Sequence, residues 1–340
     1  MPTTNPGSVS MQDVAAEAGV SAQTVSRVAN GSSQVRPETR DLVVAAMQKL
    51  GYRPNFAARA LKRGHFKAVG VVMFDILATG NILTLDGITQ AAKEKGYAVT
   101  LSMVSNASSP SLSSTVQRVR ELPIDGIVVV LEQMMADLKS FTPPTDLPIT
   151  VITSATVKGL STIDTDQYGC SEMIVDYFLQ RGHSTVHFLS GPEESVANQY
   201  RENGWRKALR TRGIEPPEPL HGDWTADSGY RAGQIFAKTD GCTAVYAAND
   251  SMANGVIQGI QDSGKRVPED ISVIGVDNSL QDTIPRLSLT TVEQNFRLIG
   301  KRAVEKTIEA IESGKHFRPT HELLPAHLIE RSSVADLTRK

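Results

Sequence analysis

Residues Ser10–Leu61 read SMQDVAAEAGVSAQTVSRVANGSSQVRPETRDLVVAAMQKLGYRPNFAARAL, and they decide the fold of the N-terminal part of the chain. Ser10 with Asp13 three residues later predicts a helix start, because exposed first-turn amides favour an oxygen cap and negative charge. Gly19 predicts the end of that helix, since glycine enters a tight turn at little cost. Ser21 predicts the cap of a second helix. The stretch therefore indicates a helix-turn-helix, followed by a third helix and a short Pro-led one.

The second helix is amphipathic in a way that suits DNA. Val25 and Val28 face inward in this pattern, which turns the N-terminal end of the helix outward. In a helix-turn-helix protein that end enters the major groove. An ordinary helical hairpin within a larger core is the alternative for the turn taken alone. The outward residues are Ala22, Gln23, Ser26 and Arg27.

The whole run resembles the DNA-binding headpiece of the LacI/GalR family of bacterial repressors. The resemblance rests on DVAAEAGVSAQTVSRVANG, VRPETR and LGYRPNFAARAL within this stretch. It continues in GDWTADSGY at 222–230, AANDSMANG at 247–255, EDISVIGVDN at 269–278 and LTTVEQNFRLIG at 289–300. The similarity thus covers nearly the whole chain and implies a sequence-specific transcriptional regulator.

Side-chain chemistry suggests how the second helix would read DNA. Gln23 can pair with an adenine edge, and Arg27 can reach guanine O6 and N7. Ala22 offers at most a contact to a thymine methyl where similar family members carry a bulky aromatic, so we expect a different half-site from theirs. Thr24, Ser26 and Asn30 suit phosphates, which set register. A solvated helix face is the alternative for any one of these residues.

Residues 53–61, RPNFAARAL, form a second candidate DNA element. Pro54 can begin a helix because its missing N–H would be unpaired there, yet the segment is too short to be helical alone. In the family two such hinge helices fold together on the minor groove, and a leucine opens the central base step. Leu61 matches that leucine. Inserting such a wedge costs a few kcal/mol, because it unstacks the base step. A plain linker is the alternative. The matching neighbours are Asn55, Ala58 and Arg59.

Composition restricts the class of protein. The 340 residues suit two or three domains, and neither a membrane span nor an export signal is indicated, so we expect a cytoplasmic protein. Only Cys170 and Cys242 occur, far apart, which disfavours a metal site. Residues 1–64 hold eight Lys/Arg against four Asp/Glu, a net charge of +4, and the remainder holds 27 against 33, a net of −6. A basic head on an acidic body suits a polyanion-binding module.

From Lys67 onward short apolar runs alternate with helical patterns, which predicts an α/β fold of doubly wound parallel sheets. A polar interval near 154–167 separates the runs and favours two sheets. Predicted strands are Ala68–Met73, Ala98–Met103, Gly126–Leu131, Ile149–Thr153, Thr185–Ser190, Thr243–Ala247 and Ile271–Val276. Predicted helices include Ile82–Lys95, Tyr168–Gln180, Val196–Arg212 and Met252–Ser263.

The resemblance, rather than the pattern, implies the domain organisation. It implies two subdomains of periplasmic-binding-protein type, with chain crossings near 162, 292 and 322. The expected parts are a helix-turn-helix headpiece at 1–52, a hinge helix and linker at 53–66, and an effector-binding and dimerisation domain at 67–340. Within the last, the N-subdomain covers about 67–162 and 293–322, and the C-subdomain about 163–292 and 323–340.

The effector site is expected in the cleft between the subdomains. Arg201 offers a fork of donors for vicinal hydroxyls, and Trp224 offers a ring for a sugar's C–H face. Asn249 and Asp277 each follow a predicted strand, at the edge where ligands bind open α/β sheets. Each residue has a structural alternative: Asn249 could cap a helix, Asp277 could close a turn, and Trp224 could lie in a core. All four match family sugar-binding positions, as do Gln294 and Phe296; Phe296 could equally be a core residue.

Departures from the family pattern affect the wall of the first subdomain. An aspartate expected after the fourth predicted strand is replaced by Thr153 or Ser154, and Phe74 stands where a small polar residue is usual. Asp75 is a candidate to replace the lost carboxylate. Because the C-subdomain wall is kept, a galactoside is the leading expectation for the effector. No cofactor, metal or catalytic residue is expected.

The resemblance implies a homodimer on a pseudo-palindromic operator, since one headpiece reads one half-site. The expected function is repression of carbohydrate-utilisation genes, relieved by a sugar. A corepressor-dependent regulator, as in the purine-responding branch, is the alternative. A sugar-modifying enzyme is a remote one, because no GxxxxGK[ST], GxGxxG or GxSxG motif is found. A periplasmic binding protein would need an export signal where this chain has a basic headpiece.

Overall fold

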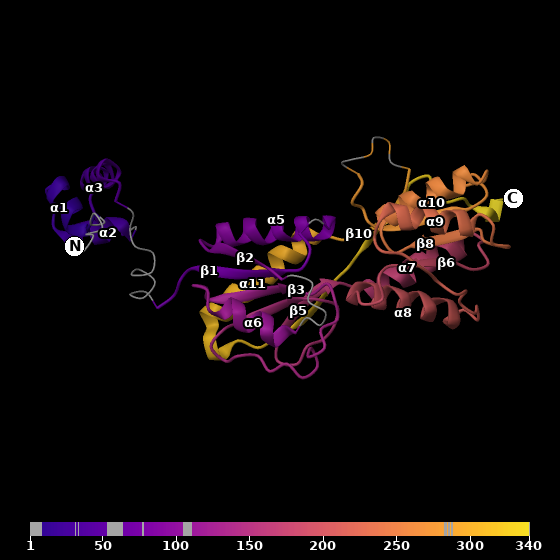
Figure 1. The fold of residues 1–340 in the computed structure, drawn as a ribbon, viewed down its shortest axis with the longest axis horizontal. Coiled ribbons are helices and arrows are strands. Elements are labelled where there is room, and N and C mark those ends of the chain that lie inside the picture. Colours follow the sequence, from indigo (N-terminus) through magenta and orange to yellow (C-terminus); the bar gives the residue numbers. More distant parts are fainter. Residues whose placement is uncertain are drawn as a thin grey trace, which may run out of the picture. The chain divides into compact units, whose positions relative to one another are not determined.

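The structure is a computed structural model that describes residues 9–30, 32, 34–52, 64–76, 78–104, 111–281, 284, 286 and 288–339. The chain divides into two compact units, residues 1–66 and 67–340. Figure 1 shows the helices of the first unit and the sheets with their covering helices in the second. Each unit is taken by itself below.

The first unit contains the predicted helix-turn-helix and third helix. A reciprocal capping box joins Ser10 and Asp13, and Gly19 adopts a left-handed conformation with φ of 63°, so both predicted signals are confirmed. Val14, Val25 and Val43 are fully buried, one from each helix. The helices are α1 (Met11–Ala18), α2 (Ala22–Ala29) and α3 (Pro37–Leu50).

The first sheet of the second unit is wholly parallel. Two helices cover one face, where Val69 and Val71 pack with Ile88 and Ile299. A third helix covers the other face, where Gly70 leaves room for Val119. In spatial order the strands are β11 (His321–Leu324), β5 (Ser161–Thr165), β4 (Ile149–Ile152), β3 (Gly126–Val130), β1 (Ala68–Met73) and β2 (Ala98–Met103). The helices are α5 (Thr79–Glu94), α11 (Phe296–Ser313) and α6 (Leu112–Arg120), with the short 3₁₀ turn η1 (Gly314–His316) after α11.

The second sheet is parallel except for one antiparallel edge strand. Its core is aromatic: Trp205 stacks on Phe188, which also contacts Tyr246. In order the strands are β12 (His327–Ile329), β10 (Thr290–Glu293), β9 (Ser272–Asp277), β8 (Ala244–Ala247), β6 (His187–Ser190) and β7 (Leu220–His221). The helices are α7 (Gln167–Gln180), α8 (Val196–Thr211), α9 (Ala226–Phe236), α10 (Asp250–Asp262) and the 3₁₀ turn η2 (Leu337–Arg339).

We call the first sheet with its helices the N-subdomain and the second the C-subdomain. The α/β fold class with two parallel sheets is confirmed, and all seven predicted strands are present with ends shifted by at most two residues. The chain changes sheet after Thr165, Glu293 and Leu324. The first of these lies beyond the expected position near 162, because β5 pairs with β4 and β11 in the N-subdomain.

The polar interval at 154–167 was expected to separate the sheets, and it instead contains β5. Its polar residues are satisfied internally: Thr162 Oγ1 lies 2.6 Å from His321 Nδ1, and Ser154 Oγ donates to Asp164 at 2.7 Å. Internal partners allow a strand whose side chains, apart from the core residue Ile163, are all polar to be buried. Among the described residues, no helix is long and apolar enough to cross a membrane.

Candidate functional site

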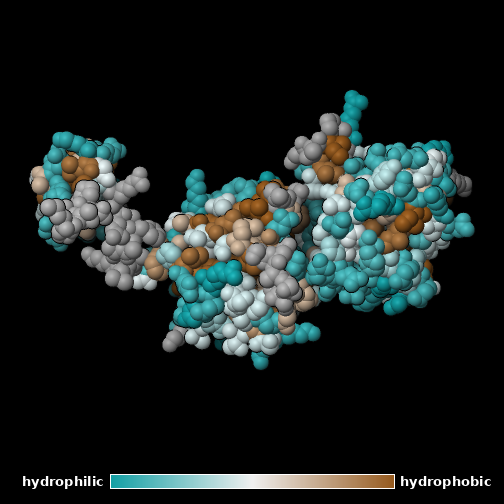
Figure 2. All heavy atoms as spheres, viewed as in Figure 1, coloured by the Kyte–Doolittle hydropathy of each residue, from teal (hydrophilic) through white to brown (hydrophobic). Residues whose placement is uncertain are grey.

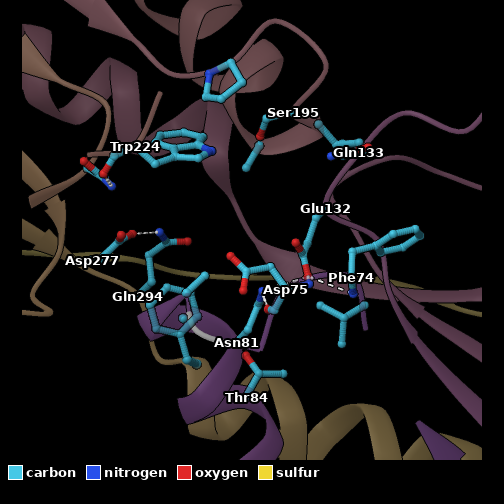
Figure 3. A pocket seen from close by; sticks show the side chains of 18 of the residues that line it. Phe74, Asp75, Asn81, Thr84, Glu132, Gln133, Ser195, Trp224, Asp277 and Gln294 are labelled. Carbon is cyan, nitrogen blue, oxygen red and sulfur yellow. Dashed lines mark hydrogen bonds between the residues drawn. The ribbon is translucent and has the colours of Figure 1, made fainter. Parts of the chain in front are cut away.

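A cavity of about 580 Å³ lies at the carboxyl ends of both sheets, where parallel strands gather the side chains that follow them. Figure 3 shows Trp224, Asp277 and Gln294 on one side of it, facing Asn81 and Glu132 on the other. The structure places every residue predicted for the effector site in this lining. These are Phe74, Asp75, Arg201, Trp224, Asn249, Asp277, Gln294 and Phe296.

Arg201 sits in a ring on the C-subdomain wall that three hydrogen bonds and one longer ion pair close. Its side chain is 5% exposed, and its Nε donates to Gln167 Oε1 at 2.8 Å. Gln167 Nε2 donates to Gln294 Oε1 at 2.6 Å, and Gln294 Nε2 donates to Asp277 Oδ1 at 2.5 Å. Asp277 Oδ1 lies 3.7 Å from Arg201 Nη2, and Arg201 Nη1 also donates to the carbonyl of Ala248. The ring joins α7 and α8 to β9 and to the segment that re-enters the N-subdomain.

Asp277 is held in an unusual state within this ring. Burial raises its pKa to about 6, although Arg201 and the Gln294 amide favour the charged form. Its backbone has φ of 111° and Asn278 follows with φ of 52°, both in the region that favours glycine. Such strain is typical of sites where a side chain must be aimed. Asp277 therefore presents a fixed acceptor at the end of β9.

The Asn249 side chain is held by two hydrogen bonds within the protein, one of them to the backbone of Trp224. Its Oδ1 accepts the Met252 N–H at 2.8 Å and caps α10, which is the capping alternative left open by the sequence. Its Nδ2 donates to the Trp224 carbonyl at 3.1 Å, and Trp224 has φ of 72°. A Cβ on Gly191 would come within 2.3 Å of the Trp224 ring, so the glycine leaves room for it. The ring borders the cavity, and the Arg201 guanidinium carbon lies 5.9 Å from its centre.

The two phenylalanines are less available than Trp224. Phe74 is buried at the end of β1, and Phe296 packs over Gly80 and the N-subdomain core. Phe296 is therefore partly a core residue, as the alternative interpretation of the sequence allowed. Both rings contribute apolar surface to the cavity lining.

The headpiece presents the residues predicted to meet DNA on α2. Gln23 and Arg27 are exposed on the side away from the buried Val25, and Ala22 and Asn30 are also exposed. Thr24 and Ser26 are half-buried, and Thr24 Oγ1 lies 3.0 Å from the Ser21 hydroxyl. The first turn of α2 contains no acidic residue, so its positive dipole end suits an anion. The predicted hinge residues lie outside the described residues: Asn55, Ala58, Arg59 and Leu61.

Comparisons with known proteins agree with both parts of the structure. The sequence profile of bacterial regulatory proteins of the lacI family matches residues 10–55, and that of the periplasmic binding protein-like domain matches residues 175–334. The lactose operon repressor of Escherichia coli (strain K12) is 31% identical over 328 residues, covering 96% of this chain and 91% of that protein. The chain belongs to the LacI family. The resemblance found in the sequence is thereby confirmed, and this LacI-family protein is a DNA-binding transcriptional repressor.

Two further matches support the assignment of this LacI-family protein. The transcriptional repressor PurR of Erwinia tasmaniensis is 32% identical over 332 residues, covering 96% of this chain and 97% of that protein. The crystal structure of the lac repressor dimer bound to operator and the anti-inducer ONPF superposes with a TM-score of 0.81 and 29% identity. It covers 97% of this chain and 100% of that one. The named relatives are regulators rather than enzymes.

Glu132 is a cavity residue of this LacI-family protein that sequence reasoning missed. Its Oε1 accepts N–H groups from Asn81 Nδ2 at 2.7 Å, from the Asp75 backbone at 3.3 Å and from the Phe74 backbone at 3.4 Å. Burial, with the nearby Asp75 charge, raises its pKa to about 7 despite these donors. It directly follows the apolar run that forms β3, so the strand-end reasoning applied to Asp277 would have found it.

Asp164 is the second missed carboxylate. It lies on β5, borders the cavity and accepts the Ser154 hydroxyl at 2.7 Å. Burial raises its pKa. Ser154 follows β4, near where the family pattern would place an aspartate, so a carboxylate is present one strand away. The lining therefore offers Glu132 and Asp164 beside Asp75 as substitutes for the missing group.

We expect Glu132→Gln to change how stability depends on pH. The folded-state pKa of Glu132 lies above its ordinary 4.5, so its stabilising effect is complete at low pH and lost as pH rises through about 7. Glutamine keeps an acceptor without the charge. We predict that the variant melts about 2–4 °C above the wild type at pH 8 and close to it at pH 5. Thermal melts at both pH values measure the difference.

Glu218→Gln is the matched control, because Glu218 is exposed and lies outside the cavity lining. Its melting temperature should follow the wild type at both pH values. Parallel curves for Glu132→Gln and the wild type would show that burial of the Glu132 charge has no energetic effect.

Proposed function

We propose that this protein represses carbohydrate-utilisation genes and releases its operator when a sugar binds the cavity, with a galactoside as the leading effector. The supporting observation is the hydrogen-bonded ring of Arg201 and Asp277 beside the Trp224 face at the junction of the two subdomains. Oriented donors and acceptors next to an aromatic ring suit a polyhydroxylated ligand. We place the protein in the cytoplasm with the nucleoid DNA.

We assign residues 1–52 to DNA recognition, 53–66 to the hinge and linker, and 67–340 to effector binding and dimerisation. In the headpiece, Gln23 and Arg27 would read base edges, with Ala22 at most contacting a thymine methyl. Thr24, Ser26 and Asn30 would contact phosphates. The exposed N-terminal end of α2 supports this assignment.

The effector would bind between the two walls of the cavity. Trp224 would cover a sugar face, while the ring residues Arg201, Asp277 and Gln294 would exchange hydrogen bonds with its hydroxyls. Both subdomains line the cavity, so bound sugar would favour one arrangement of the subdomains over another. DNA and sugar then weaken each other's binding by the same factor, which is the thermodynamic content of induction.

We predict that the protein is a homodimer. Ile82 on α5 and Leu101 and Met103 on β2 are 49%, 39% and 42% exposed, which is high for large apolar side chains. Figure 2 shows this part of the N-subdomain surface as an apolar patch. A patch of this kind marks an interaction surface. Light scattering at micromolar concentration should give the mass of two chains, and the mass of four would refute the prediction.

We predict that Leu61→Ser weakens operator binding and leaves sugar binding intact. A serine cannot act as an apolar wedge between base pairs, so the free energy of bending the site is no longer offset. We expect a loss of about tenfold or more in operator affinity, measured by fluorescence anisotropy. Unchanged DNA affinity would favour the linker interpretation of this segment.

A corepressor-dependent regulator is the alternative, and one titration separates the two. A labelled DNA fragment from the region upstream of the protein's own gene is bound by the protein, and β-galactosides and other sugars are then added at fixed salt. Release by a galactoside supports the proposal in full, and release by another sugar changes only the effector. Tighter DNA binding with a ligand would support corepression.

A further inference from the structure

The cavity has an unbalanced charge. Among the lining residues that the structure describes, one is basic, Arg201, and the others with charge are carboxylic acids. A ligand entering this space meets negative potential from both subdomains, and the low-dielectric walls strengthen that potential. The acidic residues are Asp75, Glu132, Asp164, Glu194, Asp223 and Asp277.

Arg201 is poorly placed to offset this charge for an anionic ligand. Its guanidinium already donates to Gln167 Oε1 and to the carbonyl of Ala248, and it lies 3.7 Å from Asp277 Oδ1. Only 5% of its side chain is exposed. An anion clamp needs a fork of free N–H donors directed at the ligand. Here two of the five N–H groups donate to protein acceptors, and Nη2 faces the Asp277 carboxylate.

The N-subdomain wall concentrates the negative charge. Asp75 and Glu132 lie close enough that the Asp75 charge raises the pKa of Glu132. Three N–H groups, from Phe74, Asp75 and Asn81, donate to Glu132 Oε1, and all three are uncharged. Figure 3 shows this cluster facing the cavity opposite Trp224. Carboxylate oxygens accept hydrogen bonds from ligand hydroxyls, whereas a ligand anion at the same place is repelled.

We propose that the cavity accepts uncharged polyhydroxylated effectors and rejects their anionic analogues, with Asp75 and Glu132 as the residues that determine this specificity. The rejected class comprises uronic acids and sugar phosphates. This inference rests on the proposed function, since it concerns the chemistry of the effector for the same cavity. Selection works by repulsion of the wrong ligand as well as by attraction of the right one.

The test uses the full-length protein and two ligands that differ in one group. An aryl β-galactoside and the corresponding aryl β-galacturonide differ only in the oxidation of C6, and the matching glucoside and glucuronide form a second pair. Calorimetry at pH 8 gives a dissociation constant for each. We expect the uncharged member of at least one pair to bind at least tenfold more tightly than the anionic member.

Variants separate charge from shape. The double variant Asp75→Asn/Glu132→Gln removes both charges with little change in size, and the ratio of the two dissociation constants should fall at least fivefold. Glu218→Gln removes one exposed charge outside the lining, and its ratio should equal that of the wild type. Melting curves verify that each variant is folded. Because ratios within one protein are compared, a general loss of affinity does not affect the result.

Each outcome has a distinct meaning. Equal affinities within both pairs for the wild type, or a ratio unchanged in the double variant, would overturn the specificity inference and leave the sugar-responsive repressor intact. Failure of every sugar to bind, with operator binding preserved, would overturn the sugar effector itself and the inference with it. The inference is supported if the ratio of the two dissociation constants falls in the double variant and stays unchanged in Glu218→Gln.

Discussion

Arg27→Ala is expected to reduce operator affinity by about 5- to 150-fold per half-site, which corresponds to about 1–3 kcal/mol for a base-reading arginine. Arg27 is exposed one helical turn after Gln23, on the side of α2 away from the buried Val25. It makes no contact that the helix core needs, so the variant should fold normally. Fluorescence anisotropy with the operator at fixed salt measures the effect.

The pattern of the loss separates base reading from charge alone. If Arg27 reads a guanine, the variant should become tolerant at one base pair of each half-site, whereas a phosphate contact would weaken all sequences equally. Lys49→Ala is the control, because it also removes one positive charge from the headpiece. The Lys49 side chain lies on α3 and is 68% exposed. Equal losses in both variants, with no change in sequence preference, would contradict the assigned role.

Local signals were enough to predict the headpiece. Ser10, Asp13 and Gly19 act within one helix and its turn, so their effect does not depend on the rest of the fold. Six of the seven predicted strands are similar cases, because continuous apolar runs are buried wherever a parallel sheet is covered on both faces; the seventh, β2, is a partly exposed edge strand. For these elements the sequence contains the physical cause.

The remaining strands have causes outside their own segments. β5 is mostly polar, and it is buried because its polar side chains have partners outside the strand: Ser154, ten residues before Asp164, and His321, 159 residues after Thr162. β7, β10, β11 and β12 are short edge or crossover strands whose partners lie in other parts of the sequence. No local pattern records such pairings. The three chain crossings were available only through the family resemblance.

The cavity shows the same division. Asp277 was predicted from its position after an apolar strand and from its match to a family sugar-binding position. Glu132 meets the first criterion only. Asn249 illustrates the opposite case: its position after a strand suggested a ligand contact, and the structure uses its Oδ1 to cap α10. The position of a polar residue after a strand is predictable, whereas its partner depends on the neighbouring segments.

Arg201→Lys is expected to produce a repressor that binds its operator and no longer responds to sugar. Lysine keeps the positive charge beside Asp277 and loses the planar fork that reaches Gln167 and the Ala248 carbonyl. The same fork is proposed to donate to the sugar's hydroxyls. A hydrogen bond to a charged group contributes about 1.5–3 kcal/mol, so losing two such bonds to the sugar should raise the sugar concentration needed for release by about 100-fold or more. The change is confined to unit 67–340, which leaves the headpiece intact.

The choice of lysine follows from the buried charge. Arg201→Ala would leave Asp277 buried without its cation and destabilise the domain by about 3–5 kcal/mol, which confuses loss of response with loss of folding. Arg206→Lys is the control: Arg206 is on the same helix and pairs with Glu202 outside the cavity lining. Anisotropy titrations with sugar should shift for Arg201→Lys alone. Normal release by sugar in Arg201→Lys would show that the effector is held elsewhere in the cavity, with Glu132 and Asp164 the first residues to test.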